Sequence, residues 1–246
     1  MRLQDRVAVV TGGASGFGEG IVRRFASEGA HVVIADLNEE AARKLAKEIG
    51  GLAVRADISR GADVKALARA ALERFGGIDI LVNNAGIGHK PQPLDTLTED
   101  DFDRILAINA KSVFLTAREI VPLMKTKKRG AILNIASTGG VSPRPNLTWY
   151  NASKGWMITA TRAMAVELAP FGIRVNAINP VAGETPLLAT FMGEDTPEIR
   201  AKFLASIPIG RFSTPQDIAA AACFLCSDEA SMITGVALEV DGGRCI

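Results

Sequence analysis

The stretch Thr11-Gly12-Gly13-Ala14-Ser15-Gly16-Phe17-Gly18 joins a short apolar run to a helical pattern, and it decides the interpretation of the chain around it. The run Val7–Thr11 precedes the stretch, and the pattern Phe17–Glu28 overlaps its end. Glycines let a backbone turn tightly and approach a ligand closely, and a helix start supplies unpaired N–H donors and the positive end of a dipole. This strand-turn-helix context predicts a site for the pyrophosphate of a dinucleotide.

Outward from this turn, short apolar runs alternate with helical patterns. Most runs are apolar throughout, which is typical of strands that are covered on both faces of a parallel sheet. The predicted strands are Val7–Thr11, His31–Asp36, Leu52–Asp57, Ile78–Val82, Ala131–Ala136, Ile173–Ile178 and Val236–Val240. The predicted helices are Phe17–Glu28, Glu39–Ile49, Ala62–Phe75, Glu99–Thr126, Trp149–Leu168 and Pro215–Ser227. The alternation predicts one α/β domain over residues 1–246, with a doubly wound parallel sheet built by right-handed crossovers.

One segment breaks the alternation. Residues 181–211 lie between the last two predicted strands and contain three prolines and three glycines among other loop-forming residues. A long excursion inside a compact domain usually has a function. We expect a flap over about 184–211 that covers a substrate, and a structural helical hairpin is the alternative.

Composition narrows the class of protein. The chain has 246 residues, 48% of them hydrophobic, and a formal net charge of +1, which gives no electrostatic basis for binding nucleic acid or a membrane. We expect a cytoplasmic protein, because the start of the chain lacks the pattern of a secretory signal and no apolar run approaches the ~20 residues of a spanning helix. Cys223 and Cys226 form a C-x-x-C that fits a redox pair or half of a zinc site. Core packing is the preferred interpretation, because both histidines are remote in sequence, and no metal site is expected.

Two carboxylates follow predicted strands. Asp36 ends the second strand about twenty residues after the glycine turn, where a carboxylate can accept hydrogen bonds from adenosine ribose hydroxyls and would repel a 2′-phosphate. Leu37 follows it, and no basic residue lies in the turn, so the pattern predicts NAD rather than NADP. Asp57 ends the third strand, where it could meet the adenine amino group, and Asn83-Asn84-Ala85-Gly86 follows the fourth strand, where small residues let a cofactor lie along the sheet edge.

The chain has one tyrosine, Tyr150, and Lys154 follows one helical turn later. A nearby ammonium, together with the positive charge of an oxidised nicotinamide, would lower the pKa of the phenol. The phenol could then exchange a proton with an alcohol or a carbonyl. Ser137 closes the fifth strand, where its hydroxyl could orient the substrate oxygen. The alternative is that Tyr150 packs in the helix and Lys154 is solvated.

The ordered set of these residues resembles the short-chain dehydrogenase/reductase family over essentially the whole chain, Val7 to Gly243. The resemblance rests on the glycine turn, Asp57, Asn83-Asn84-Ala85-Gly86, Asn109, Ser137, Tyr150-x-x-x-Lys154 and Arg174-Val175-Asn176 before Pro180. It implies a Rossmann-type seven-stranded sheet in the order 3-2-1-4-5-6-7 and a homotetramer. It also implies Asn109, Ser137, Tyr150 and Lys154 as the catalytic set, with Lys154 contacting the nicotinamide ribose.

The residues expected to contact the cofactor are Gly12, Ser15, Gly16, Phe17, Gly18, Asp36, Leu37, Asp57, Ile58, Asn84, Ala85, Gly86, Tyr150, Lys154, Pro180, Ala182, Gly183 and Thr185. One departure from the family pattern falls after the sixth strand, where Val181 replaces the usual glycine and Gly183-Glu184 is unusual. The sequence therefore does not predict the backbone path beneath the nicotinamide, although Thr185 keeps its spacing from Pro180.

The substrate-contacting residues are expected among His89, Gly139, Arg144, Asn146, Glu184 and Leu187. We predict hydride transfer between NAD and a secondary alcohol or ketone, with a sugar, a polyol or a hydroxy acid as substrate. Reduction of 3-oxoacyl thioesters with NADPH, as by 3-oxoacyl-[acyl-carrier-protein] reductases, is the alternative. A non-catalytic module that only binds the cofactor is a further alternative, which the presence of both Tyr150 and Lys154 disfavours.

Overall fold

The computed structural model describes residues 1–246 and contains one seven-stranded parallel sheet. The strand order is β3-β2-β1-β4-β5-β6-β7, and every neighbouring pair is parallel. The strands are β1 (Val7–Thr11), β2 (His31–Asp36), β3 (Leu52–Arg55), β4 (Ile80–Asn83), β5 (Gly130–Ile135), β6 (Ile173–Pro180) and β7 (Ala237–Val240). The predicted fold class and strand order are confirmed.

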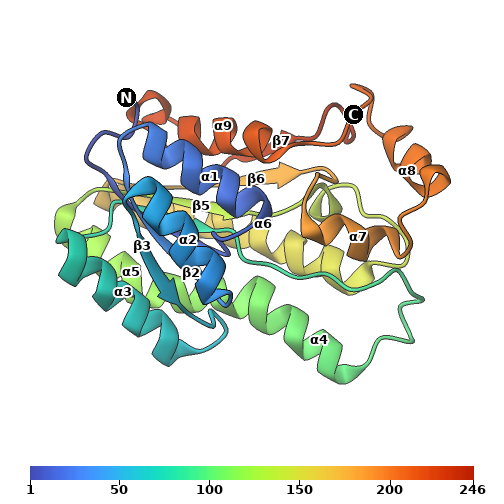
Figure 1. Cartoon of the computed structure of the whole chain (residues 1–246), viewed down its shortest axis with the longest axis horizontal. Coiled ribbons are helices and arrows are strands. Elements are labelled where there is room, and N and C mark those ends of the chain that lie inside the picture. The colour runs from blue at the N-terminus through green and yellow to red at the C-terminus, as the bar shows by residue number, and fades with distance from the viewer.

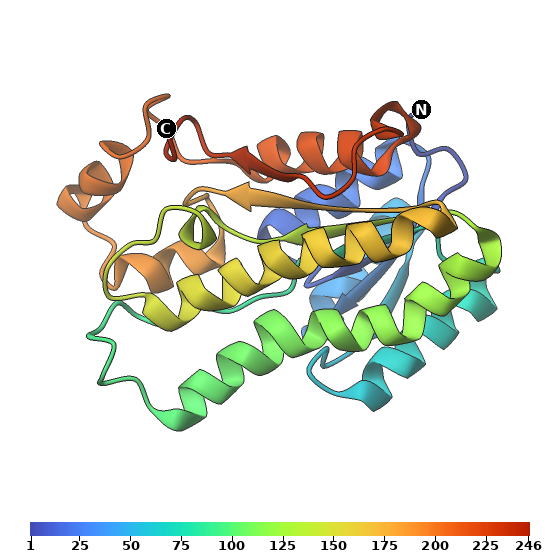
Figure 2. The same ribbon diagram turned by 180° about the vertical axis from the view of Figure 1, so that it is seen from behind.

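Helices cover both faces of this sheet (Figures 1 and 2). The helices are α1 (Gly16–Ser27), α2 (Glu39–Ile49), α3 (Gly61–Phe75), α4 (Glu99–Leu106), α5 (Ser112–Lys127), α6 (Thr148–Leu168), α7 (Pro186–Met192), α8 (Pro197–Leu204) and α9 (Pro215–Cys226). One apolar core packs α1, α2 and α9 against the sheet, and a second packs α3, α5 and α6 against the opposite face. The strands alternate their side chains between the two cores, so Val9 belongs to one and Val10 to the other. This burial on both faces explains why the strands are apolar throughout.

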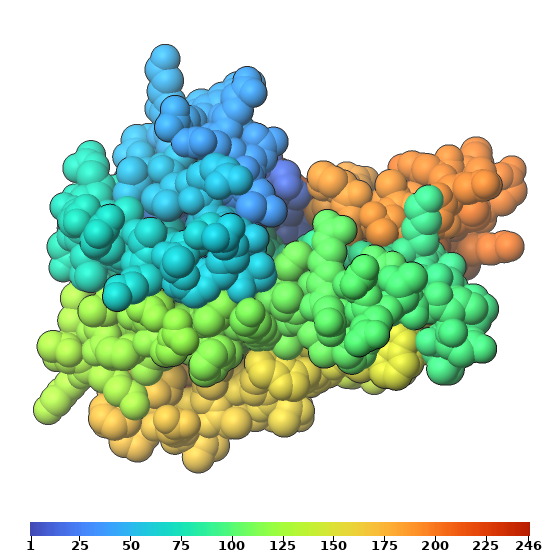
Figure 3. Space-filling model, turned by 90° about the horizontal axis from the view of Figure 1, so that it is seen from below, coloured from blue at the N-terminus to red at the C-terminus, as the bar shows by residue number.

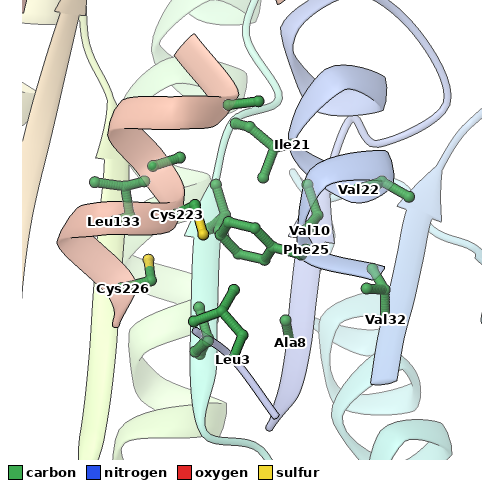
Figure 4. Close-up of a cluster of buried hydrophobic side chains, with 14 of the residues drawn as sticks. Leu3, Ala8, Val10, Ile21, Val22, Phe25, Val32, Leu133, Cys223 and Cys226 are labelled. Carbon is green, nitrogen blue, oxygen red and sulfur yellow. The ribbon is translucent and has the colours of Figure 1, made fainter. Parts of the chain in front are cut away.

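The two cysteines of the C-x-x-C lie in the core between α9 and the sheet, beside Phe25 and Leu133 (Figure 4). Both thiols are free, and burial raises the pKa of Cys226 to about 12. No group of His, Cys, Asp and Glu side chains in the structure is suited to hold a metal ion. The core-packing interpretation of this motif is confirmed.

Two element boundaries differ from the sequence prediction for identifiable reasons. β3 ends at Arg55 rather than at Asp57, because the Asp57 carboxylate accepts hydrogen bonds from the backbone and hydroxyl of Ser59 and forms a turn. The predicted helix Glu99–Thr126 is interrupted by a π-helical turn, Ala107–Lys111, between α4 and α5. Hydrophobic periodicity does not reveal a single widened turn, because the apolar side of the helix continues on both sides of it.

The flap segment, Glu184–Arg211, contains α7 and α8 and lies beyond the carboxyl ends of the strands. Figure 3 shows the orange flap segment and the green α4 region at the same end of the molecule. Leu188, Met192 and Ile207 of the flap segment form a small apolar cluster with Val181 and Phe212. No helix in the structure has the length and apolarity needed to cross a bilayer.

Candidate active site

The glycine turn is built by close backbone contacts rather than by side chains. Gly12 and Gly16 have φ of +61° and +55°, which favour glycine. A Cβ on Gly18 would overlap the carbonyl oxygen of Gly12, so no side chain fits where α1 crosses the turn. Asn84 Nδ2 donates to the carbonyl oxygens of Thr11 and Gly12, at 2.9 and 3.0 Å, and ties the turn to the loop after β4.

The start of α1 is suited to hold a pyrophosphate. Ser15, the N-cap residue, makes no capping bond with its side chain. The first-turn N–H groups of a helix have no intrahelical acceptor, and they meet the positive end of the helix dipole. Ser15, Gly16 and Phe17 all line the large cavity at the strand ends. This cradle of glycines and free donors therefore fits a dinucleotide.

The end of the same cavity that β2 and β3 border is acidic. Asp36 ends β2, and its carboxylate accepts hydrogen bonds from the N–H of Ala14 at 3.0 Å and of Asn38 at 2.9 Å. Both oxygens keep a second lone pair, so the group can still accept from a ribose. Hydrogen bonds from Ser59 lower the pKa of Asp57, which keeps this second carboxylate ionised. The only basic residues that line the cavity, Arg144 and Lys154, lie elsewhere along it.

Tyr150 and Lys154 lie one turn apart on α6 and both line the cavity. Both side chains are almost fully buried, with residue exposures of 6% and 4%. Lys154 Nζ donates to the carbonyl oxygen of Ile135 at 2.8 Å and lies 6.0 Å from the centroid of the Tyr150 ring. Ser137, two residues after the end of β5, accepts a hydrogen bond from the N–H of Gly139 and also contacts the phenol. The phenol, the hydroxyl and the ammonium therefore converge on one end of the cavity.

The protein groups alone do not make this phenol acidic. Burial raises the pKa of Tyr150 to about 12, and the hydrogen bond from Ser137 opposes this only in part. Burial also lowers the pKa of Lys154 to about 8, because desolvation disfavours the ammonium. Desolvation therefore dominates the pKa of the phenol in the cofactor-free protein. The predicted lowering of the phenol pKa also depends on the positive charge of a bound oxidised nicotinamide, which the protein's own groups do not supply.

Asn109 lies behind the cavity, at the π-helical turn, and is fully buried. Its Nδ2 donates to the carbonyl oxygen of Ile87 at 2.9 Å and to Ser153 Oγ at 3.0 Å, and its Oδ1 accepts from the N–H of Ile87. A Cβ on Gly86 would lie 3.2 Å from Lys154 Nζ and 3.3 Å from Asn109 Oδ1. The asparagine therefore holds the loop that contacts Lys154 and does not line the cavity.

The flap segment packs against the phenol ring. The ring of Phe191 in α7 lies 4.8 Å from that of Tyr150, centroid to centroid. The flap begins against the glycine turn, because a Cβ on Gly183 would overlap the ring of Phe17 and a Cβ on Gly16 would lie 3.2 Å from Thr185 Cβ. Val181, which replaces the usual glycine, is buried in the apolar cluster beneath α7.

The cavity has a volume of about 460 Å³ and gathers most of the predicted site residues. Of the residues assigned to cofactor contact, all but Gly18 line it, since Gly18 supports the turn from behind. Of the six assigned to substrate contact, Gly139, Arg144 and Leu187 line it. Three do not: His89 is buried with Nδ1 against the carbonyl oxygen of Lys90, while Asn146 and Glu184 are exposed.

Sequence reasoning missed several lining residues. Phe203 of α8, Leu147 before α6 and Asn151, which follows the tyrosine, line the cavity beside the expected groups. The sequence could have indicated Asn151, because this residue is adjacent to Tyr150. In the structure its Nδ2 donates to the carbonyl oxygen of Arg144 at 2.8 Å. Phe203 carries no local signal, because its position depends on how the flap folds back.

A crevice at the carboxyl ends of a Rossmann-type parallel sheet, with a glycine turn at one end and a buried tyrosine and lysine at the other, defines a class of nicotinamide-dependent oxidoreductases. Residues 12–244 match the family model described as enoyl-(acyl carrier protein) reductase. The chain belongs to the short-chain dehydrogenase/reductase family.

Relatives of this chain act on varied alcohols and carbonyl compounds. The chain is 50% identical to 4-formylbenzenesulfonate dehydrogenase TsaC1/TsaC2 of Comamonas testosteroni, over 100% of both chains. It is 39% identical to 2,5-dichloro-2,5-cyclohexadiene-1,4-diol dehydrogenase LinX of Sphingobium indicum, over 98% of this chain and 97% of the relative. The structure of 3-ketoacyl-(acyl-carrier-protein) reductase from Brucella melitensis complexed with NADH has a TM-score of 0.95 and 56% identity, covering 99% of this chain and 100% of that one.

Proposed function

We propose that this chain is an NAD-dependent dehydrogenase that interconverts a small alcohol and its carbonyl compound, with Tyr150 as the proton-transfer group. The observation that carries the proposal is the meeting of Tyr150, Ser137 and Lys154 at one end of a cavity whose other end carries Asp36. A nicotinamide dinucleotide, when bound, supplies the acceptor or donor of the hydride.

Each side chain has a distinct part in this reaction. The Ser137 hydroxyl orients the substrate oxygen and stabilises negative charge on it. Tyr150 exchanges a proton with that oxygen, in the direction that the reaction requires. Lys154, held by Ile135, supplies the neighbouring positive charge, and Asn109 positions the Gly86–Ile87 loop against it.

The choice of NAD follows from the adenosine end of the cavity. A carboxylate at Asp36 repels a 2′-phosphate, and no basic residue lines that end to offset the repulsion. The NADH complex of the Brucella melitensis relative supports the same choice.

The flap end of the cavity favours a compact substrate with an apolar body. Ile87, Leu147, Leu187, Leu188 and Phe191 all line it. Such a lining stabilises a ring or a short chain by burial of apolar surface. A hydroxy acid with an apolar body remains within the sequence-based expectation, whereas a sugar or polyol would leave several hydroxyl groups against apolar side chains. The ring substrates named for the relatives TsaC1/TsaC2 and LinX support this class.

A second candidate is reduction of 3-oxoacyl thioesters with NADPH. The name of the Brucella melitensis relative favours the substrate, although its complex contains NADH. Initial rates with NAD(H) and NADP(H), on ring alcohols and ketones and on an acetoacetyl thioester, separate the two. A large preference for NADPH with the thioester would reject the first proposal.

The direct test of the catalytic assignment is Tyr150→Phe, which removes only the phenol oxygen. We expect kcat to fall by about 10²- to 10⁴-fold, the usual contribution of a general acid or base. Binding of NADH, followed by fluorescence, should remain and serves as the control for folding. Full turnover by the folded variant would contradict the assignment and favour a non-catalytic binding module.

A further inference from the structure

Arg144 reaches the active-site cavity without any acidic partner. Its Nη2 donates to Ser206 Oγ at 2.9 Å, and its guanidinium lies over the ring of Phe203, 4.3 Å from the centroid. No salt bridge in the structure involves this arginine. A guanidinium has five N–H donors in a planar fork, so most of them are left for another acceptor.

The two arginines within the flap segment show the contrast. Arg200 pairs with Asp195 through two nitrogens, and Arg211 pairs with Asp217 at 2.6 and 2.9 Å. Both are exposed surface pairs. Arg144 is half-buried, and a desolvated charge costs more free energy to leave unpaired than an exposed one.

A second cation lies beside Arg144. Arg244 Nη1 donates to Ser142 Oγ at 3.1 Å, and its buried Nε has no hydrogen-bond partner in the structure. Burial and the charge of Arg244 both lower the pKa of Arg144, and no carboxylate acts in the opposite direction. Two neighbouring guanidinium groups thus share a partly desolvated region with unfilled donors.

This cationic region adjoins the catalytic phenol. Asn151, which follows Tyr150 on α6, donates to the carbonyl oxygen of Arg144. Gly139 lies between the amide of Asn151 and the phenol ring. A Cβ added to Gly139 would lie 2.6 Å from Asn151 Oδ1 and 3.5 Å from Tyr150 Cε1. A small molecule at Tyr150 can therefore extend toward Arg144 within the same cavity.

We propose that the substrate carries an oxyanion, such as a carboxylate, which the guanidinium of Arg144 binds at the end of the cavity away from the cofactor, with the charge of Arg244 in support. This inference rests on the proposed function, because the subsite belongs to the same cavity. A planar fork suits a carboxylate through two parallel hydrogen bonds. Phe203 holds the plane of the fork through a cation–π contact.

The subsite also links the substrate to the flap. Phe203 and Ser206 both lie in the flap segment, while Arg144 lies in the loop before α6. An anion that fixes Arg144 also fixes the surface against which α8 packs. Substrates without an anion lack this contact and should bind a less ordered flap.

The test compares two ketones of the same shape, 4-acetylbenzoate and 4-acetylbenzamide, reduced with NADH. The measured quantity is the kcat/KM for the anion divided by that for the neutral amide. We expect Arg144→Gln to lower this quotient by on the order of 10- to 100-fold, as expected for loss of a charge-assisted hydrogen bond. Arg144→Lys should restore part of it. Arg69→Gln, which removes the same charge from an exposed position on α3, is the matched control and should leave the quotient at its wild-type value.

A quotient that is the same in Arg144→Gln as in the wild type, or that falls equally in Arg69→Gln, would overturn the proposal. Calorimetric titration of the NADH complex with benzoate and with benzamide separates this proposal from the proposed function. Benzoate binding that Arg144→Gln weakens, without turnover of any ketone, would uphold the subsite and reject the dehydrogenase. Turnover of ketones without a preference for benzoate over benzamide would uphold the dehydrogenase and reject the subsite.

Discussion

The glycine turn after β1 and the flap segment border the same cavity, but different contacts hold them. The turn is fixed by backbone: positive φ at Gly12 and Gly16, no space for a Cβ at Gly18, and the amide of Asn84 on two carbonyl oxygens. The flap is held by a small cluster of apolar side chains and by ion pairs at its surface.

This difference separates the two tasks of the site. On the proposed function, the backbone of the glycine turn binds the pyrophosphate of the cofactor, which every reaction of the enzyme shares, and it tolerates little change. A flap held by side chains can change its lining while the fold stays the same. The names of the relatives agree with this division, since their substrates differ while the family fold is common.

The largest expected effect comes from adding one methyl group to the turn. Gly18→Ala would press a Cβ into the carbonyl oxygen of Gly12, and we expect the free energy of unfolding to fall by about 3 kcal/mol. Affinity for NADH should fall by about 100-fold, because the donors of α1 move. The matched change in the flap segment is Gly193→Ala, where a new Cβ would meet nothing within 4 Å. Only the φ of +74° would be unfavourable for alanine, and we expect the free energy of unfolding to fall by about 1 kcal/mol. Chemical denaturation and fluorescence titration measure both variants, and equal losses would contradict the contrast.

The buried lysine gives the next largest effect, on stability against pH in the cofactor-free protein. Burial lowers the pKa of Lys154 from 10.5 to about 8, so between these values the unfolded chain binds a proton that the folded chain does not. The free energy of unfolding should therefore gain up to about 3 kcal/mol as pH rises from 8 to 10.5. Above pH 10 the raised pKa of Tyr150 acts in the opposite direction, because the unfolded phenol then loses its proton first.

Lys154→Met isolates this contribution. Denaturation at several pH values from 7 to 10 gives the difference in unfolding free energy between wild type and variant. We expect the wild type to gain stability relative to the variant across this range. A difference that stays level with pH would show that the ammonium is solvated.

Cofactor choice should shift by a smaller amount when Asp36 loses its charge. Asp36→Ser removes the repulsion of a 2′-phosphate, and we expect the ratio of kcat/KM for NAD over NADP to fall by roughly 10- to 30-fold. Asp195→Ser removes a carboxylate from the flap and is the control. If the ratio were unchanged by Asp36→Ser, the adenosine end would not select the cofactor.

The smallest effect is expected in the flap. Phe191→Ala removes the ring that packs on Tyr150, and we expect KM for the substrate to rise about fivefold through lost apolar contact. The Kd for NADH should change by less than about twofold. A larger change in cofactor affinity than in substrate KM would show that the flap belongs to the cofactor site.

The sequence predicted the parts of the molecule that depend on local patterns. Apolar runs located all seven strands to within about two residues, and the glycine spacing placed Gly12, Gly16 and Asp36 along one cavity. These signals are local because a turn, a helix start and a strand end each need particular residues at fixed offsets.

The sequence could not predict what depends on burial or on distant packing. The phenol of Tyr150 was predicted to be acidified by Lys154 together with an oxidised nicotinamide. In the cofactor-free protein, desolvation raises the pKa of the phenol and lowers the pKa of the lysine, and spacing along a helix carries no information about this burial. His89 and Glu184 were assigned to the cavity from their positions in loops, and the folded loops direct them elsewhere. Phe203 enters the cavity only because α8 returns to it.

The π-helical turn at Ala107–Lys111 makes chain length critical at one point of a long helix. The turn contains one residue more than an α-helical turn, and that extra residue offsets α5 from α4 by about 100° of rotation. Removing a single residue other than Asn109 there would change the composition very little and would make the helix regular. It would also rotate the amide of Asn109 away from Ile87, or else turn the buried side of α5 out of the core. The widened turn therefore lets Asn109 contact the loop at Ile87 while α5 keeps its buried side in the core.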